Sequence, residues 1–238
     1  MIPKSGQTES VCLFLTKNSA CEYNVFGKVI SVEVRVIENL NEEYLQKDCI
    51  NLVPFGLVER IDYRMQLRGN CKDLVFLGKL SKKWGGITLI GVESDNCNHV
   101  KKSVLVFEGS HLTAICDMNA YEEKFTPSFG YKTITFKGKK IGVLVDRDLF
   151  NPTAVSSFVN CGVSAIINLY EGFCSNKPHV ACEFYSYVYG VDVIYLAPNE
   201  RFYYDAFGDR KDFSLGIVNC GYASVYKEVK KKVRGNNS

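Results

Sequence analysis

Several features that mark particular classes of protein are missing from this sequence. No run of about 18 apolar residues occurs, so nothing predicts a transmembrane helix. The first residues lack the basic and then apolar pattern of a secretory signal. The net charge of +3 is too small to indicate nucleic acid or an acidic membrane surface as a partner. We therefore expect a cytoplasmic protein that binds neither nucleic acid nor membranes.

Patterns typical of metal and disulfide sites are also absent. The 10 cysteines are scattered and form no CxxC pair, and the three histidines, His99, His111 and His179, lie far apart in the chain. Scattered cysteines in a folded cytoplasmic chain are usually reduced and buried. We therefore expect no metal site, no disulfide framework and no cofactor.

The composition is that of a folded α/β protein. Hydrophobic residues make up 46% of the chain, which has 15 phenylalanines and 14 tyrosines. No tandem repeat or linker divides it, so we predict a single domain over residues 1–238, with frayed tails at 1–9 and 227–238. Hydrophobic periodicity predicts helices at 39–46, 74–84, 153–161 and 180–189. Apolar runs and alternation predict strands at 11–15, 29–36, 49–53, 87–92, 141–145, 163–169, 191–196 and 213–218.

The rest of the chain is organised around residues 136–169. A short β-branched run at 141–145 predicts a buried strand, and three charges at 146–148 follow it directly. Asn151 can cap the next helix, Pro152 suits its first turn and Gly162 can end it. A strand, helix and strand of this length predict a right-handed parallel unit. Residues just past a strand's carboxyl end are where such units bind ligands, so the charges mark a candidate site.

This stretch resembles the nucleophile segment of the nitrilase (carbon–nitrogen hydrolase) superfamily. Residues 140–143 and 166–168, together with Asp148, Pro152 and Gly162, match the family pattern in register. Residues 148–152 are most similar to the glutaminase domain of glutamine-dependent NAD synthetases. The resemblance covers about residues 45–220 and implies a four-layer α-β-β-α sandwich, with strands at 103–108 and 112–118. The residues alone do not distinguish this nitrilase-like α/β fold from a doubly wound one.

The resemblance also implies what has changed at the site. The family uses a cysteine nucleophile, a glutamate base and a lysine that holds the oxyanion. The aligned positions hold Asp146 for the cysteine and Phe55 for the glutamate, and Met118 or a neighbour stands for the lysine. We therefore predict a superfamily member that has lost the Cys-Glu-Lys triad and serves as a binding or assembly subunit.

The predicted loss of the family's lysine rests on a stretch of sequence that contains no lysine. No lysine occurs between Lys102 and Lys124, and we expect residues 101–102 to lie in a solvated turn. In the segment that follows, Glu122 or Glu123 matches a glutamate that supports the family's site.

Two other interpretations remain open. In the first, the chain is a divergent amide hydrolase in which Asp146 and Asp148 join Glu59 or Glu123 in a carboxylate cluster. The cluster would activate water as a general base, with or without a metal, and Lys124 can in principle reach it. In the second, the charges at 146–148 form only an ion-pair network in a pocket that binds nothing.

The resemblance further implies partners. The ligand would be a small amide or carboxylate, and the chain would form a homodimer or a hetero-oligomer with a related subunit. The family commonly dimerises through helices beside the nucleophile segment, which here is the predicted helix at 153–161. A second helix, at 180–189, places Val180, Phe184, Tyr187 and Val188 on one face.

Overall fold

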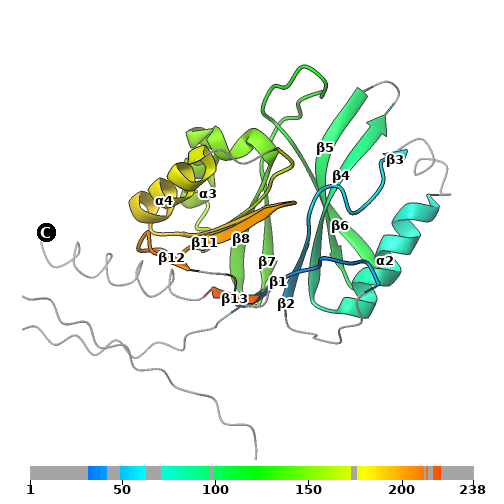
Figure 1. Ribbon diagram of the computed structural model, residues 1–238, viewed down its shortest axis with the longest axis horizontal. Coiled ribbons are helices and arrows are strands. Elements are labelled where there is room, and N and C mark those ends of the chain that lie inside the picture. The colour runs from blue at the N-terminus through cyan, green and yellow to red at the C-terminus, as the bar shows by residue number, and fades with distance from the viewer. Residues whose placement is uncertain are drawn as a thin grey trace, which may run out of the picture.

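Two β-sheets face each other in the computed structural model, and helices cover the outer side of each (Figure 1). The structure describes residues 32–41, 49–62, 71–96, 99–172, 176–211, 213 and 217–220. The predicted strand at 11–15, most of the predicted helix at 39–46 and both expected tails lie outside these residues. The two facing sheets, with helices outside each, form the predicted four-layer α-β-β-α order.

The first sheet has the strand order β13-β1-β2-β4-β5-β6, with β3 beside β4. Its strands are β1 (Val32–Val36), β2 (Cys49–Val53), β3 (Ile61–Asp62), β4 (Ile87–Asn96), β5 (His99–Glu108), β6 (His111–Asp117) and β13 (Ile217–Cys220). Helix α2 (Lys72–Trp84) covers the outer face through its fully buried Trp84. β4 and β5 pair along their whole length, so the hairpin between them is shorter than predicted. The last predicted strand begins at Ile217, and Phe213 precedes it as a core residue.

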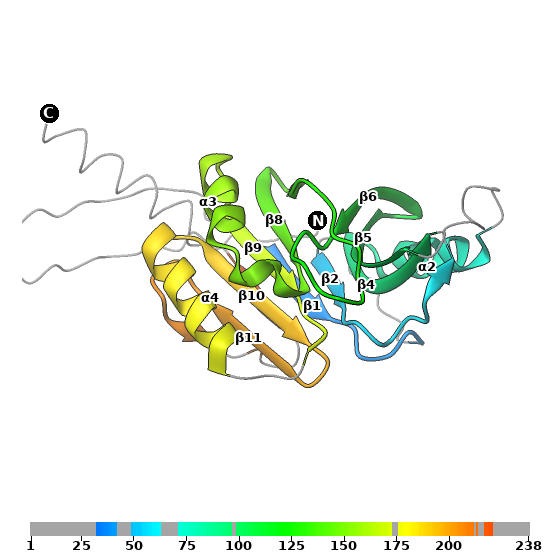
Figure 2. The ribbon, with the colours of Figure 1, turned by 90° about the horizontal axis from the view of Figure 1, so that it is seen from above.

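The second sheet has the strand order β12-β11-β10-β9-β8-β7. Its strands are β7 (Lys132–Phe136), β8 (Lys139–Val145), β9 (Ala165–Leu169), β10 (Asp192–Ala197), β11 (Glu200–Tyr204) and β12 (Arg210–Lys211). Helices α3 (Pro152–Asn160) and α4 (Asn176–Tyr189) cover its outer face (Figure 2). β8 and β9 are parallel, which confirms the predicted strand–helix–strand unit.

Local sequence signals account for this unit. The Asn151 side chain accepts the Thr153 backbone N–H at 3.0 Å and caps α3. Gly162 has a φ of +77°, a left-handed conformation that ends the helix at low steric cost. α3 then packs closely on the sheet, because a Cβ at Gly142 would lie 2.5 Å from the ring of Phe158. Gly142 therefore sets the distance between α3 and β8.

Helix α4 forms as predicted, but its apolar face points outward. Val180, Phe184, Tyr187 and Val188 are all exposed. The residues that α4 buries are Pro178, Cys182, Tyr185 and Ser186. Aromatic side chains of β10 and β11 line the sheet beneath α4, where Cys182 and Tyr185 pack against them. None of the described helices is long and apolar enough to span a bilayer.

One buried carboxyl group generates a testable pH dependence. Asp192 is 2% exposed, and its carboxylate accepts the Ala206 backbone N–H at 3.0 Å. Burial raises the pKa of Asp192 from 3.8 to about 7. The folded protein therefore holds this proton more tightly than the unfolded chain does. The contribution of Asp192 to the free energy of unfolding is largest below about pH 4 and is lost as the pH rises through about 7.

We expect the contribution of Asp192 to fall by about 3–4 kcal/mol over this range. Urea unfolding of the wild type and of Asp192→Asn, at pH values between about 4 and 8, measures it. The wild type should lose more stability with rising pH than the variant, which cannot titrate at this position. Parallel pH profiles of the two proteins would contradict the assignment.

Candidate functional site

Asp146 occupies a sharp turn at the carboxyl end of β8. Its φ of +48° is a left-handed conformation that non-glycine residues rarely adopt, and such strain is concentrated at functional sites. The Asn168 side chain donates to the Asp146 carbonyl at 3.1 Å and supports the turn. Asp146 is 1% exposed, so its carboxylate is held inside the protein.

Lys102 lies against Asp146 and is itself 6% exposed. Its ammonium nitrogen forms an ion pair with the Asp146 carboxylate, and it lies 3.0 Å from Glu171 Oε2 and 3.3 Å from Glu122 Oε2. The ring of Phe125 covers the ammonium, with its centroid 4.4 Å from Nζ. We call Lys102, Asp146, Glu122 and Glu171 the lysine–carboxylate cluster.

The electrostatics of the cluster keep Lys102 charged. Burial alone would lower the pKa of Lys102, but hydrogen bonds and charge interactions with Asp146 and Glu171 outweigh it and raise the pKa above its usual range. Burial, with added repulsion from Glu122 and Glu171, raises the pKa of Asp146. One cation, Lys102, thus pairs with three carboxylates, so the lysine–carboxylate cluster has more acidic than basic groups.

The prediction that residues 101–102 form a solvated turn is wrong. Both lie within β5, where Lys101 pairs with Asp117 at 2.9 Å and Lys102 points into the protein. Lys102 was also not predicted to lie at the site, where the structure pairs it with Asp146. Met118 is buried in the core, but its backbone N–H bonds to the Lys102 carbonyl, so Lys102 reaches the site from the neighbouring strand.

A signal for Lys102 was present in the sequence. Side chains alternate along a strand, so Lys102 shares a face with Val104 and Val106, which are buried in the core between the sheets. Extending the predicted strand at 103–108 by one residue would have placed Lys102 inward. Glu171 stands two residues past β9, a position that also favours a site residue.

Phe55 follows β2 and is buried, 3% exposed, against Gly91. A Cβ at Gly91 would lie 2.9 Å from the Phe55 ring, so the absence of a side chain at Gly91 makes room for this ring. Phe55 and Met118 both belong to the core between the sheets. Neither side chain has a group that can exchange a proton.

The alternative participants do not gather around Asp146. Glu59, Glu123 and Lys124 are exposed, and none of them pairs with Asp146 among the described residues. Of the two neighbouring glutamates, Glu122 is the one that contacts the cluster.

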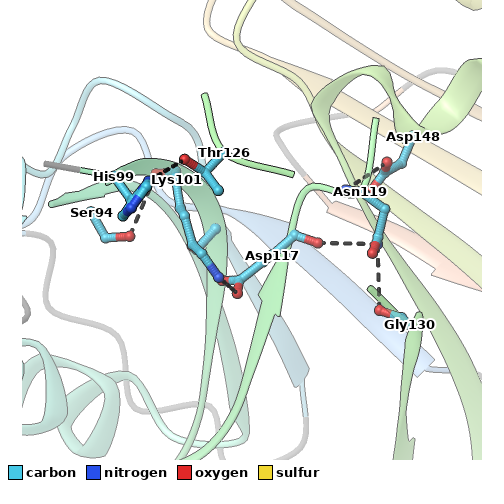
Figure 3. Close-up of polar contacts among 9 residues, drawn as sticks. Ser94, His99, Lys101, Asp117, Asn119, Thr126, Gly130 and Asp148 are labelled. Atoms are coloured by element: carbon cyan, nitrogen blue, oxygen red, sulfur yellow. Dashed lines mark hydrogen bonds and ion pairs between the residues drawn. The ribbon is translucent and has the colours of Figure 1, made fainter. Parts of the chain in front are cut away.

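Asp148 is buried and serves a different purpose. Its carboxylate oxygens accept the Asn119 backbone N–H at 3.0 and 3.1 Å and the Ala120 N–H at 2.7 Å. Burial raises the pKa of Asp148 to about 6, against the effect of these donors. Figure 3 shows Asn119 between Asp148, Asp117 and Gly130. The Asn119 side chain donates to the Gly130 carbonyl at 3.4 Å. Asp148 thus fastens the segment that crosses from the first sheet to the second.

A cavity of about 710 Å³ lies at the carboxyl ends of parallel strands from both sheets. Its described lining is Val36, Glu38, Pro54, Phe55, Gly56, Leu57, Glu171, Leu196, Ala197, Pro198, Asn199, Glu200 and Arg201. Glu171 connects the cavity to the cluster, because it lines the first and contacts Lys102 in the second. Asp146 and Lys102 are not among these lining residues.

Other reactive groups are not placed for chemistry in the described part of the chain. No group of three or more His, Cys, Asp or Glu side chains there could hold a metal ion. Cys116 lies two residues before Met118, but burial raises the pKa of its thiol to about 12. At neutral pH this cysteine remains a protonated and poorly nucleophilic thiol.

Several solved structures share this arrangement at low sequence identity. Nit3 of Saccharomyces cerevisiae, a member of branch 10 of the nitrilase superfamily, superposes with a TM-score of 0.65 at 13% identity. The match covers 84% of this chain and 94% of that one. A carbon–nitrogen hydrolase from Helicobacter pylori matches with a TM-score of 0.65 at 13% identity, over 86% of this chain and 93% of the other.

A glutamine-dependent NAD+ synthetase from Acinetobacter baumannii matches over 80% of this chain but 45% of its own length, with a TM-score of 0.60 at 12% identity. No protein-family model matches the sequence, and no curated protein matches it. The likeness therefore lies in the three-dimensional arrangement of the chain. The predicted fold is confirmed, and this chain has the α/β sandwich fold of the nitrilase superfamily.

Proposed function

We propose that this chain is a nitrilase-superfamily protein that has lost amide hydrolysis and binds a small molecule in the cavity beside the cluster. The observation that carries the proposal is the environment of Lys102. An ammonium group has three N–H donors, and three carboxylates lie within 3.3 Å of Nζ. These acceptors satisfy all three donors, so none remains to stabilise an oxyanion.

The other two catalytic positions support the same proposal. An amidase of the nitrilase type needs a thiolate nucleophile, and a carboxylate such as Asp146 is far less nucleophilic. Attack by Asp146 on an amide would also give an anhydride, which is a poor intermediate. Phe55 offers only a hydrocarbon ring where the family's glutamate would accept a proton. Loss of an activated nucleophile removes most of an enzyme's rate.

The cavity supports a binding role. Its volume of about 710 Å³ is in the range of small-molecule sites, and it lies where α/β sheets usually bind ligands. The similarity to a glutamine-dependent synthetase suggests an ancestral substrate with an amide group. We therefore propose an organic ligand of a few carbon atoms, with a small amide or carboxylate as the starting candidates.

A divergent hydrolase is the second candidate, and one observation favours it. Glu122 and Glu171 lie beside Asp146 and supply the carboxylate cluster that Glu59 and Glu123 do not. Burial raises the pKa of Asp146, which suits a proton donor. Against this candidate, Lys102 pairs with all three carboxylates of the cluster, so none of them is left unpaired to act as a general base.

An amide-hydrolysis assay decides between the two. We expect no ammonia release from glutamine or short aliphatic amides above the level of an Asp146→Ala variant, because no activated nucleophile is present. Glu59→Ala, at an exposed position outside the cavity lining, is the matched control. Turnover that Asp146→Ala abolishes and Glu59→Ala preserves would overturn the proposal. One equivalent of metal in the active protein would identify the second candidate.

We also propose that the chain assembles with a second copy of itself through α4. The apolar residues of α3 are buried on the sheet, and the helix exposes Thr153, Ser157 and Asn160, which makes it a poor interface. α4 instead exposes four large apolar side chains on one face: Val180 (64%), Phe184 (54%), Tyr187 (68%) and Val188 (45%). For location we propose the reducing cytoplasm, since the five cysteines whose side chains the structure describes form no disulfide with one another.

Light scattering after size-exclusion chromatography tests the α4 surface. We expect a dimer that Phe184→Glu dissociates, with a loss of affinity of about tenfold or more, because a charge would be buried at the interface. Phe76→Glu is the matched control, since Phe76 is 52% exposed on α2 at the other side of the molecule. A monomeric wild type, or equal effects of both substitutions, would contradict this interface.

A further inference from the structure

We infer that the ligand of the cavity is an organic cation, with an alkyl body that ends in a primary ammonium or guanidinium group. This inference rests on the proposed binding function and specifies the class of ligand. It is carried by the charges and the apolar surface of the described residues that line the cavity.

The charge of the lining is negative. It contains three glutamates, Glu38, Glu171 and Glu200, and one basic residue, Arg201, which gives a net charge of −2. The Arg201 guanidinium already forms an ion pair with Glu38. The carboxylates stand on both walls, because Glu38 follows β1 of the first sheet whereas Glu171 and Glu200 belong to the second.

The described charges around the lining do not cancel this charge. Lys102, which contacts Glu171, and Arg147, which contacts Glu122, contribute two positive charges, and Asp146 and Glu122 balance them. His179 lies 2.6 Å from Glu200 and carries a charge only when it is protonated. Whether or not His179 is counted as positive, the described surroundings of the cavity keep a net negative charge, which attracts a cation and repels an anion.

The uncharged part of the lining fits the body of such a ligand. Phe55, Leu57, Leu196 and Pro198 present apolar surface between the two acidic walls. An alkyl chain can bury against these residues, at about 25 cal/mol for each Å² removed from water, while its cationic end meets a carboxylate. A carboxylate ligand would be repelled by the same glutamates. The one arginine of the described lining, Arg201, is already paired with Glu38 and would not offset this repulsion.

Isothermal titration of the full-length chain with three probes of equal length tests the inference: n-pentylamine, pentanamide and pentanoate. We expect n-pentylamine to bind most tightly and pentanoate at least tenfold more weakly. Raising the salt from about 50 to about 500 mM should weaken amine binding several-fold, because charge interactions are screened. Glu171→Gln should weaken it by about tenfold, which corresponds to one lost ion pair of about 1.4 kcal/mol.

Two further variants separate the effect of the cavity charge from that of the cluster and from that of a surface charge. Glu171 also contacts Lys102, so Glu38→Gln, on the opposite wall, removes a cavity charge and leaves the cluster intact. Glu59→Gln removes an exposed charge outside the described lining and should leave binding unchanged.

The possible outcomes separate this inference from the proposed function. Pentanamide binding as tightly as n-pentylamine would overturn the cationic ligand and leave the binding role standing. Hydrolysis of pentanamide would overturn the loss of catalysis instead. Failure of all three probes to bind, or equal effects of Glu38→Gln and Glu59→Gln, would also overturn the inference.

Discussion

The ion pair between Lys102 and Asp146 is the constraint on which the site depends. Lys102 comes from β5 in the first sheet and Asp146 from the end of β8 in the second, so the pair joins the two layers. Buried charges are tolerated only when they are paired and hydrogen-bonded, and removal of one partner leaves the other uncompensated. Glu122 and Glu171 complete the shell around the ammonium, and Phe125 covers it.

Under the proposed function, this chain keeps the fold of the nitrilase superfamily without its amide-hydrolysing chemistry. The strained turn at Asp146, the Asn168 donor that supports it and the cavity all lie at the carboxyl ends of parallel strands. Phe55 depends on Gly91 for its place in the core, because a Cβ at Gly91 would lie 2.9 Å from the Phe55 ring. A scaffold can keep its binding cavity after its reactive groups are replaced, since function depends on the site and not on the fold.

The predicted strand–helix–strand unit, which rested on local signals, was confirmed. The unit β8–α3–β9 followed from a β-branched run, the Asn151 cap, Pro152 and the glycine that ends the helix, all close in sequence. The side of α4 that packs on the sheet could not be predicted in the same way. Apolar spacing shows that residues share a face of a helix but not what covers that face. The sheet beneath α4 selects Cys182 and Tyr185, and the more apolar side is left outside.

The sequence by itself determined the alternation of strands and helices and the turn at residue 146, where an aspartate stands. Periodicity, capping residues and glycines act over a few residues, so they can be read directly from the chain. Only the tertiary structure decided that Lys102, Glu122 and Glu171 meet at Asp146. These residues are 20 to 69 positions apart and come from different strands and connections. Their charges gather only when the pairing of the strands and the packing of the two sheets bring the strand ends together.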